Sequence, residues 1–209
     1  MHEGNTEGVF DELVGDAAHA YALGAWCADG YWWSSSIGIT NVEPEMIVRF
    51  SRYLLQVLPP ERLRLRIYQV EGTTLDRECM ALTEKVSIRP SCKMKQTAYQ
   101  LYVNSRPLVR RFFYSRDHLD ELPERHLGPY FSGRFDGDGT WGSTPRIVYR
   151  LEKEALTDHS LLARLKIKSS VLYYAKANEY CNYIHKSGWD QFRTLVSEHS
   201  WKINRRNTL

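Results

Sequence analysis

Two short stretches of the sequence end in the same chemistry, an aspartate followed by a glycine. Residues 22–30 read ALGAWCADG and residues 131–139 read FSGRFDGDG, so Asp29 and Asp138 stand 109 residues apart at matching places. Carboxylate oxygens are the ligands that hard divalent cations prefer in proteins. A pair of carboxylates can therefore support metal-assisted hydrolysis. The pattern indicates one acidic metal ligand from each of two similar elements.

Small residues precede each aspartate at helical spacing. Gly24 and Ala28 are four residues apart, as are Gly133 and Gly137, and such pairs share one face of a helix. Small faces let two helices approach closely. If these helices pack about a pseudo-twofold axis, the two aspartates leave adjacent C-terminal ends, where the helix dipoles disfavour negative charge unless a cation is supplied. The alternative for either motif alone is an ordinary turn with a glycine cap.

The similarity between the two halves extends beyond these motifs. Residues 41–47 align with residues 150–156 at an offset of 109, and residues 99–105 align with residues 180–186 at an offset of 81. The order is preserved, so a duplication explains both matches if the first copy carries an insertion of about 28 residues between positions 70 and 98. We expect a repeat at 1–119, a second at 120–209, and one compact pseudo-dimeric unit.

Each repeat is predicted to have, in outline, the element order αββαββα of an α+β fold, and three of the four strands are assigned to residues. In the first repeat the periodicity predicts helices from the Asp16 cap to Ala28, at 45–58 and at 107–116, and strands at 34–40, 62–68 and 100–104. In the second it predicts helices at 129–137, 156–167 and 189–200, and strands at 146–151, 170–176 and 180–185. Pro129 is expected to begin or kink its helix, because proline disrupts a helix interior.

The two acidic elements, ALGAWCADG and FSGRFDGDG, resemble the paired motifs of the LAGLIDADG homing endonucleases, and the whole chain resembles the single-chain, two-repeat form of that family. The first copy departs from the motif at Trp26 and Cys27, and the second is the better match. The resemblance implies a saddle of antiparallel sheets. It also implies a Mg²⁺-dependent, site-specific endonuclease that makes a double-strand break in DNA.

The resemblance also implies roles for individual residues. In that family the penultimate acid of each motif binds Mg²⁺ together with neighbouring carbonyl groups, so two or three divalent ions would be held by Asp29, Asp138 and the carbonyl groups of Ala28 and Gly137. The family places polar or basic groups around the attacking water, and the repeat alignment offers two pairs for that role: Asn41 with Arg150, and Arg125 with Arg206. Asp136 is interpreted as a local carboxylate, because its counterpart Cys27 cannot do the same work.

The clearest predicted strand, residues 62–68, alternates basic and apolar side chains. Its period of two places Arg62, Arg64, Arg66 and Tyr68 on one face. A two-stranded ribbon fits the DNA major groove, and arginine reads guanine edges there. The alternative is a solvated sheet face. Further DNA contacts are expected from Ser34, Ser36, Lys93, Lys95, Arg146, Arg150 and Lys176, with residues 91–97 forming either an extended hairpin or a plain surface loop.

The composition is that of a folded soluble protein, with 43% hydrophobic and 25% charged residues over 209 positions. Nineteen of its 28 basic residues are arginine, which grips phosphate well. The four irregularly spaced cysteines are expected to be buried reduced thiols. No segment resembles a signal peptide or a bilayer span. We therefore expect a soluble intracellular protein with no membrane partner. The resemblance to the single-chain homing endonucleases implies a monomer, in a prokaryotic cytoplasm or an organelle.

Two alternatives to a nuclease remain. The same scaffold could serve a catalytically silent DNA-binding protein or an intron-RNA maturase, although only Arg205 and Arg206 form a basic tail, and binding alone does not require paired carboxylates. A small-molecule enzyme is disfavoured, because the chain has no P-loop, no dinucleotide-binding glycine motif and no hydrolase or zinc-protease motif. For the nuclease, an intron-encoded gene is expected, with an intein or a free-standing gene as the alternatives.

Overall fold

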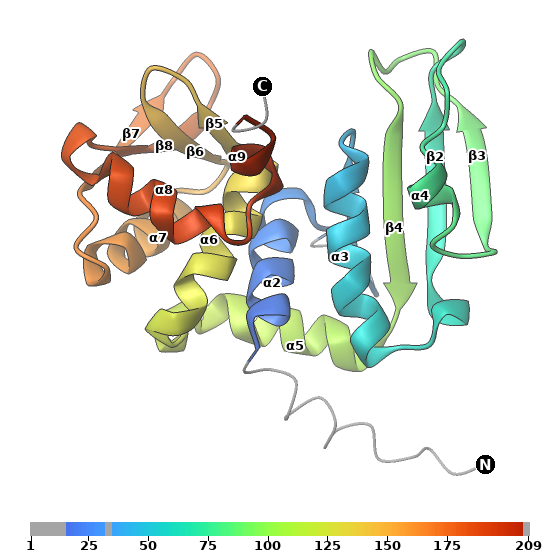
Figure 1. Ribbon diagram of the computed structural model, residues 1–209, viewed down its shortest axis with the longest axis horizontal. Helices are drawn as coiled ribbons and strands as arrows, with labels where there is room; N and C mark the ends of the chain where they lie inside the picture. The colour runs from blue at the N-terminus through green and yellow to red at the C-terminus, as the bar shows by residue number, and fades with distance from the viewer. Residues whose placement is uncertain (1–15, 32–34, 207–209) are drawn as a thin grey trace.

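The computed structural model describes residues 16–31 and 35–206, and Figure 1 shows two halves on either side of a central helix pair. The first half comprises α2 (Ala17–Asp29), β1 (Ser36–Asn41), α3 (Pro44–Val57), β2 (Arg64–Gln69), α4 (Arg77–Met80), β3 (Val86–Pro90), β4 (Ala98–Asn104) and α5 (Arg106–Asp117). The second half comprises α6 (Glu124–Asp138), β5 (Gly139–Trp141), β6 (Pro145–Tyr149), α7 (Glu152–Arg164), β7 (Ser169–Tyr174), β8 (Glu179–Ile184), α8 (Trp189–Ser197) and α9 (Trp201–Arg206).

Each half contains a four-stranded sheet, in the order β1-β4-β2-β3 in the first and β5-β6-β8-β7 in the second. Antiparallel pairing joins β1, β4 and β2, and the strands β6, β8 and β7 repeat that arrangement. The predicted α+β class, with two pseudo-symmetric repeats, is therefore confirmed. The added strand β3 pairs in parallel with β2, so the first sheet is not purely antiparallel.

The helices α2 and α6 lie side by side at the centre of the molecule (Figure 1). A Cβ atom at Gly24 would lie 2.0 Å from the carbonyl oxygen of Tyr130, and one at Gly133 would lie 2.1 Å from the carbonyl oxygen of Tyr21. A larger residue at either position would force the two backbones apart, because the interior is close-packed. The predicted seam of small residues is confirmed.

A single cluster of buried apolar side chains runs through both halves. Alternate strand residues supply it, such as Ile37 and Ile39 of β1, while α3 packs on the first sheet and α7 on the second. Three of the four cysteines are buried free thiols as expected, whereas Cys92 is exposed. Within the described residues, no helix combines the length and the apolar character needed to cross a bilayer.

The sequence offset that relates the two repeats changes by one residue after α2 and α6, the helices that carry the acidic motifs. Gly30 pairs with Ile39, whereas Gly139 pairs with Ile147. The strand partner in the second half therefore follows its glycine one residue sooner than in the first half. The offset then becomes 108, and the buried positions of α3 and α7 agree with it: Ile47, Phe50, Tyr53 and Leu54 correspond to Ala155, Asp158, Leu161 and Leu162. The alignment of Asn41 with Arg150 is therefore wrong by one position, and Tyr149 takes the place of Asn41.

The insertion folds as α4 and β3 at the outer edge of the first sheet. The second half has only the turn at residues 175–178 between its equivalent strands. Residues 91–97 do not form the expected extended hairpin. They make the turn that joins β3 to β4, in which Lys93 and Lys95 are exposed.

The predicted boundaries of three helices in the second half differ from the structure, and the helix predicted at 156–167 spans Glu152–Arg164. Helix α6 begins at Glu124 and continues through Pro129, so a helix start at the proline is wrong. The predicted helix at 189–200 ends at Ser197 and a second helix, α9, begins at Trp201, because the intervening Ser200 hydroxyl donates a hydrogen bond to Asp136 over 2.5 Å.

Candidate active site

Asp29 and Asp138 are the last residues of α2 and α6, and each is followed by a glycine that turns the chain. The Gly30 N–H donates to the Trp26 carbonyl, and the Gly139 N–H donates to the Phe135 carbonyl. A Cβ atom at either glycine would lie 2.3 Å from the aromatic side chain of that same residue. The glycines are therefore required by a close approach to the last helical turn, and the two aspartates leave the two helices in the same way.

The two aspartates line one cavity of about 740 Å³ at the C-terminal end of the seam. Burial raises the pKa of both carboxyls, that of Asp138 to about 7. The charge of Asp29 raises the pKa of Asp138 further. The structure thus brings these two predicted residues together. The other residues that line the cavity are Cys27, Ala28, Gly30, Tyr31, Thr40, Val148, Tyr149, Arg150, Leu151, Glu154 and Glu179.

Asn41 holds the carboxylate of Asp29. Its Nδ2 donates a hydrogen bond to Asp29 Oδ2 over 2.9 Å, and its Oδ1 accepts one from the Glu43 N–H over 2.8 Å. The second bond fixes the amide so that its nitrogen faces the aspartate. Arg150 is exposed at the edge of the cavity, and its positive charge lowers the pKa of Asp29.

Asp138 has a different neighbour, the buried Arg134 one turn earlier on α6. The Arg134 guanidinium lies 3.8 Å from Asp138 Oδ2, 3.1 Å from Glu154 and 3.4 Å from Asp158. It also lies 4.6 Å from the ring centre of Tyr149. In the first half, Ala25 corresponds to Arg134, Asn41 to Tyr149, Met46 to Glu154 and Phe50 to Asp158. The cavity is thus pseudo-symmetric in backbone and asymmetric in charge.

Asp136 does not face the cavity. It accepts hydrogen bonds from the Tyr21 hydroxyl, the Ser200 hydroxyl and the backbone N–H groups of Trp201 and Lys202. These two N–H groups belong to the first turn of α9, so the carboxylate caps that helix from a distance in sequence. The interpretation of Asp136 as a local carboxylate agrees with these contacts.

Lys202 enters the site from α9 and was missed by the sequence analysis. Its Nζ donates to the carbonyl oxygens of Phe135, Gly137 and Gly139 over 3.2, 3.3 and 2.9 Å. Its charge lowers the pKa of both aspartates. No repeat signal points to this lysine, because Glu121 stands at the aligned position. Only the break between α8 and α9 brings it here.

The second predicted pair of basic residues is not assembled at the cavity. Arg125 lies in the first turn of α6, about 20 Å from Asp138 along the helix axis at 1.5 Å per residue. Its Nε donates to His126 Nε2 over 3.2 Å. The prediction that Arg125 lies near the acids is therefore wrong. Arg206 ends α9, and its side chain lies outside the described residues.

The donor set at the cavity suits a hard divalent cation. Within residues 16–31 and 35–206, no cluster of three or more His, Cys, Asp and Glu side chains could hold a metal ion, so a cation here would rely on two aspartates and carbonyl oxygens. An all-oxygen set is the one that Mg²⁺ prefers. The Gly137 carbonyl already accepts from Lys202 but retains a second lone pair. Because burial raises both aspartate pKa values, a cation would relieve an existing electrostatic cost.

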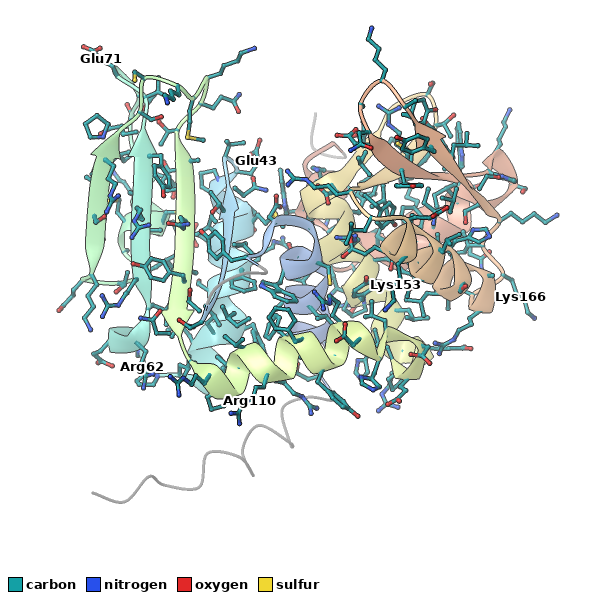
Figure 2. All side chains as sticks on the ribbon, turned by 180° about the vertical axis from the view of Figure 1, so that it is seen from behind. Glu43, Arg62, Glu71, Arg110, Lys153 and Lys166 are labelled. Carbon is teal, nitrogen blue, oxygen red and sulfur yellow. The ribbon has the colours of Figure 1, made fainter. Side chains whose placement is uncertain are left out.

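The first sheet presents the predicted basic face. In β2, Leu65 and Ile67 are buried, while Arg64, Arg66 and Tyr68 project from the other side. Arg66 donates to Gln100 Oε1 of β4 over 3.1 Å. Arg62 precedes the strand in a 3₁₀ turn and donates to the Asn104 carbonyl over 2.9 Å. Figure 2 shows Arg62 and Glu71 at opposite ends of this sheet.

The added strand β3 contributes an arginine that the sequence analysis missed. Arg89 pairs with Tyr68 in register and is exposed, so it lies on the face that carries Arg64 and Arg66. Residues 86–90 were not predicted as a strand, because their single apolar alternation, Val86 and Ile88, is too short to stand out. The basic face is therefore wider than expected.

The second sheet carries fewer charges. Arg146 of β6 donates to the Tyr183 hydroxyl over 3.0 Å. Ser170, Leu172 and Tyr174 share its face, and Lys176 is exposed in the turn after β7. In the first half, Ser36 begins β1 and Ser34 lies outside the described residues.

Comparison with known proteins supports the fold. The sequence matches no protein-family model and no curated protein. Among solved structures, the homing endonuclease I-DmoI in complex with DNA and Mn is similar, with a TM-score of 0.63 and 14% identity over 86% of this chain and 96% of that chain. I-WcaI bound to its DNA recognition sequence gives a TM-score of 0.57 and 10% identity, over 96% of this chain and 91% of that chain.

The N-terminal LAGLIDADG domain of DUF199/WhiA is also similar, with a TM-score of 0.52 and 13% identity over 94% of each chain. These likenesses agree with the two sheets that flank a central helix pair in this chain. The chain therefore has the two-repeat LAGLIDADG homing endonuclease fold.

Proposed function

We propose that the chain is a divalent-metal-dependent, site-specific endonuclease for double-stranded DNA. The observation that carries the proposal is the pair Asp29 and Asp138, which end adjoining helices from the two halves and line one cavity. Two carboxylates at two helix C-termini repel one another, so this arrangement is expected where a cation binds. One carboxylate per half suits a substrate with one scissile phosphate on each strand.

In this proposal the residues at the cavity have separate roles. Mg²⁺ held by Asp29, Asp138 and the carbonyls of Ala28 and Gly137 would supply Lewis-acid stabilisation of the attacking and leaving oxygens. Asn41 keeps the carboxylate of Asp29 in place through its 2.9 Å hydrogen bond. Lys202 and Arg150 bring positive charge to a site that must accept a phosphate anion.

The similar structures support a DNA partner and a divalent ion. I-DmoI has been solved in complex with DNA and Mn, and in complex with DNA and Ca, and a single-residue variant of it with target DNA in the presence of Mg. In this chain the basic sheet face would grip phosphates and read base edges. Both aspartates belong to one chain, so we propose that a monomer suffices. Light scattering of the complex should give one chain per duplex.

The proposal is tested by cleavage of a randomised duplex DNA library. Sequencing of cut ends in Mg²⁺ should reveal one enriched site, and EDTA should abolish cutting. Asp29→Asn and Asp138→Asn should each abolish double-strand cleavage while binding to the enriched site persists. Asp120→Asn, an exposed acid outside the cavity, is the matched control and should cut normally. Normal cutting by both seam variants would overturn the proposal.

A second candidate is a DNA-binding protein that does not cleave. The observation that favours it is Arg134, whose guanidinium lies 3.8 Å from Asp138 and supplies a built-in cation on one side of the seam. On this alternative the library would yield a bound site and no cut ends. An intron-RNA maturase on the same scaffold would instead bind structured RNA more tightly than duplex DNA in a gel-shift comparison.

A further inference from the structure

The two sheet faces that turn away from the helices are related by pseudo-symmetry but differ in chemistry. The central strands align at the offset of 81, so Gln100 and Tyr102 of β4 correspond to Cys181 and Tyr183 of β8. In the first half, Arg66 pairs with Gln100 and Arg64 pairs with Tyr102. This neighbourhood offers many hydrogen-bond donors.

In the second half the same places are mostly apolar. Leu172 pairs with Cys181, and Ser170 pairs with Tyr183. Val148 of β6 flanks Cys181 on its other side. Leu172 is 50% exposed, and its neighbours in the sheet are small or apolar. Leu172 and Val148 therefore form an apolar strip on either side of the buried Cys181, where the first half has an arginine and a glutamine.

The charges on the two faces differ accordingly. The first face carries Arg64, Arg66 and Arg89, and the adjoining turn adds Lys93 and Lys95. On the second face Arg146 donates to the Tyr183 hydroxyl over 3.0 Å and lies 5.8 Å from the centre of its ring. The acidic Glu179 pairs with Tyr174 at the end of the same face.

These chemistries read different bases in the major groove. Arginine pairs with guanine and glutamine with adenine, whereas apolar side chains contact the thymine methyl group. We infer that the DNA half-site under the second sheet is rich in A·T pairs whose thymine methyls contact Leu172 and Val148, while the half-site under the first sheet contains guanines read by Arg64 and Arg66. This inference rests on the proposed DNA-binding function and names its substrate.

The test is a binding selection on a randomised duplex library in EDTA, so that binding is scored without cleavage. The enriched site should have one half with guanines and one half with thymines. Replacing each thymine of the second half by deoxyuridine removes only the methyl group and should weaken binding by roughly fourfold per position, the equivalent of one buried methylene. The same replacement in the first half should have little effect.

Variants assign the halves to the sheets. Leu172→Gln should shift the preferred base at one position from thymine towards adenine, and Arg66→Leu should remove a guanine from the opposite half. Tyr173 is the matched control, because it is 52% exposed, next to Leu172, and on the other face of the strand. Tyr173→Gln should leave the selected sequence unchanged.

The outcomes separate this inference from the proposed function. A site with guanines equally in both halves, or deoxyuridine without effect in the second half, would overturn the inference while Mg²⁺-dependent cutting of that site would still support the endonuclease. Failure to enrich any sequence would count against both. If the selected DNA site has two unequal halves but the protein does not cut it, the inference holds and the proposed nuclease activity is contradicted.

Discussion

Tyr21 of α2 donates a hydrogen bond to Asp136 of α6 over 2.8 Å, whereas Tyr130, at the matching place on α6, donates to Asp158 of its own half over 2.8 Å. The difference follows from Cys27, which stands where a second Asp136 would be. Burial raises the pKa of Cys27 to about 12, so its thiol stays neutral and is a poor acceptor. The helix backbones are thus near-symmetric, while the polar contacts that hold them are not.

Asp136→Asn should detach α9. The carboxylate accepts four hydrogen bonds, and each of its oxygens accepts from one hydroxyl and one backbone N–H, so an amide would turn a donor towards one of the two backbone N–H groups. We expect a loss of about 2 to 3 kcal/mol in the free energy of unfolding, the range for hydrogen bonds to a buried charged group. Urea denaturation measures it, with Asp120→Asn as the exposed control. Equal stability of the two variants would contradict the role of Asp136 as a remote cap.

Arg134→Met should destabilise the protein by about 3 to 5 kcal/mol, because it leaves the buried Asp158 and the half-buried Glu154 without their cation. The first half suggests the repair. Changing Arg134, Glu154 and Asp158 to Ala, Met and Phe copies Ala25, Met46 and Phe50. This triple variant should recover most of the lost stability. The remaining loss comes from the hydroxyls of Tyr130 and Tyr149, which lose their acceptor Asp158. A triple variant no more stable than Arg134→Met would refute the equivalence of these positions.

The free protein should lose stability as pH rises through neutrality. Burial raises the pKa of the acids in and beside the cavity, namely Asp29, Asp136, Asp138, Glu154 and Asp158. A carboxyl whose folded pKa is raised binds its proton more tightly when folded, so its contribution to stability is complete below the unfolded pKa and is lost as the pH rises to the folded pKa. For Asp138, with a pKa of about 7, the window runs from about pH 4 to about pH 7.

Thermal unfolding in EDTA measures this dependence. Between pH 5.5 and 8 the midpoint should fall by about 5 °C, the scale of 1 to 2 kcal/mol in a chain of this size. Asp138→Asn removes the titration and should flatten the slope, and Mg²⁺ at pH 8 should raise the midpoint of the unaltered protein. A midpoint that rises over this range, or an unchanged slope in the variant, would be the opposite result.

Lys202→Met should slow cleavage by about a hundredfold, the usual effect of deleting one electrostatic contact at a reacting group. The change also removes a charge that lowers the pKa of Asp138, so the pH profile of cleavage should shift to higher pH. Lys153→Met, on the exposed start of α7, is the control. A slower reaction with an unmoved pH profile would mean that Lys202 acts only by packing.

Much of the site was predictable because it depends on local patterns. The glycine seam and the two terminal aspartates follow from residue types at helical spacing, and the basic face of β2 follows from strict alternation. Both patterns can be recognised within the sequence of a single helix or strand. The α+β class followed from the order of such elements.

The remainder depended on tertiary contacts. The one-residue change of offset was hidden because glutamates align at 109 by chance, whereas strand pairing sets 108. Lys202 was missed because a carboxylate 66 residues away, Asp136, starts the helix that carries it. Arg125 was misplaced because it was chosen from its alignment with Arg206 at the offset of 81, whereas the structure places it in the first turn of α6, far from Asp138.

The most direct test of the account is the position of Mn²⁺ in crystals of the protein with its selected DNA, located by anomalous X-ray scattering. The account predicts a peak between the two motif helices, about 2.2 Å from a carboxylate oxygen of Asp29 and of Asp138, a normal metal–oxygen distance. A peak bound elsewhere, or DNA seated away from the seam, would contradict it.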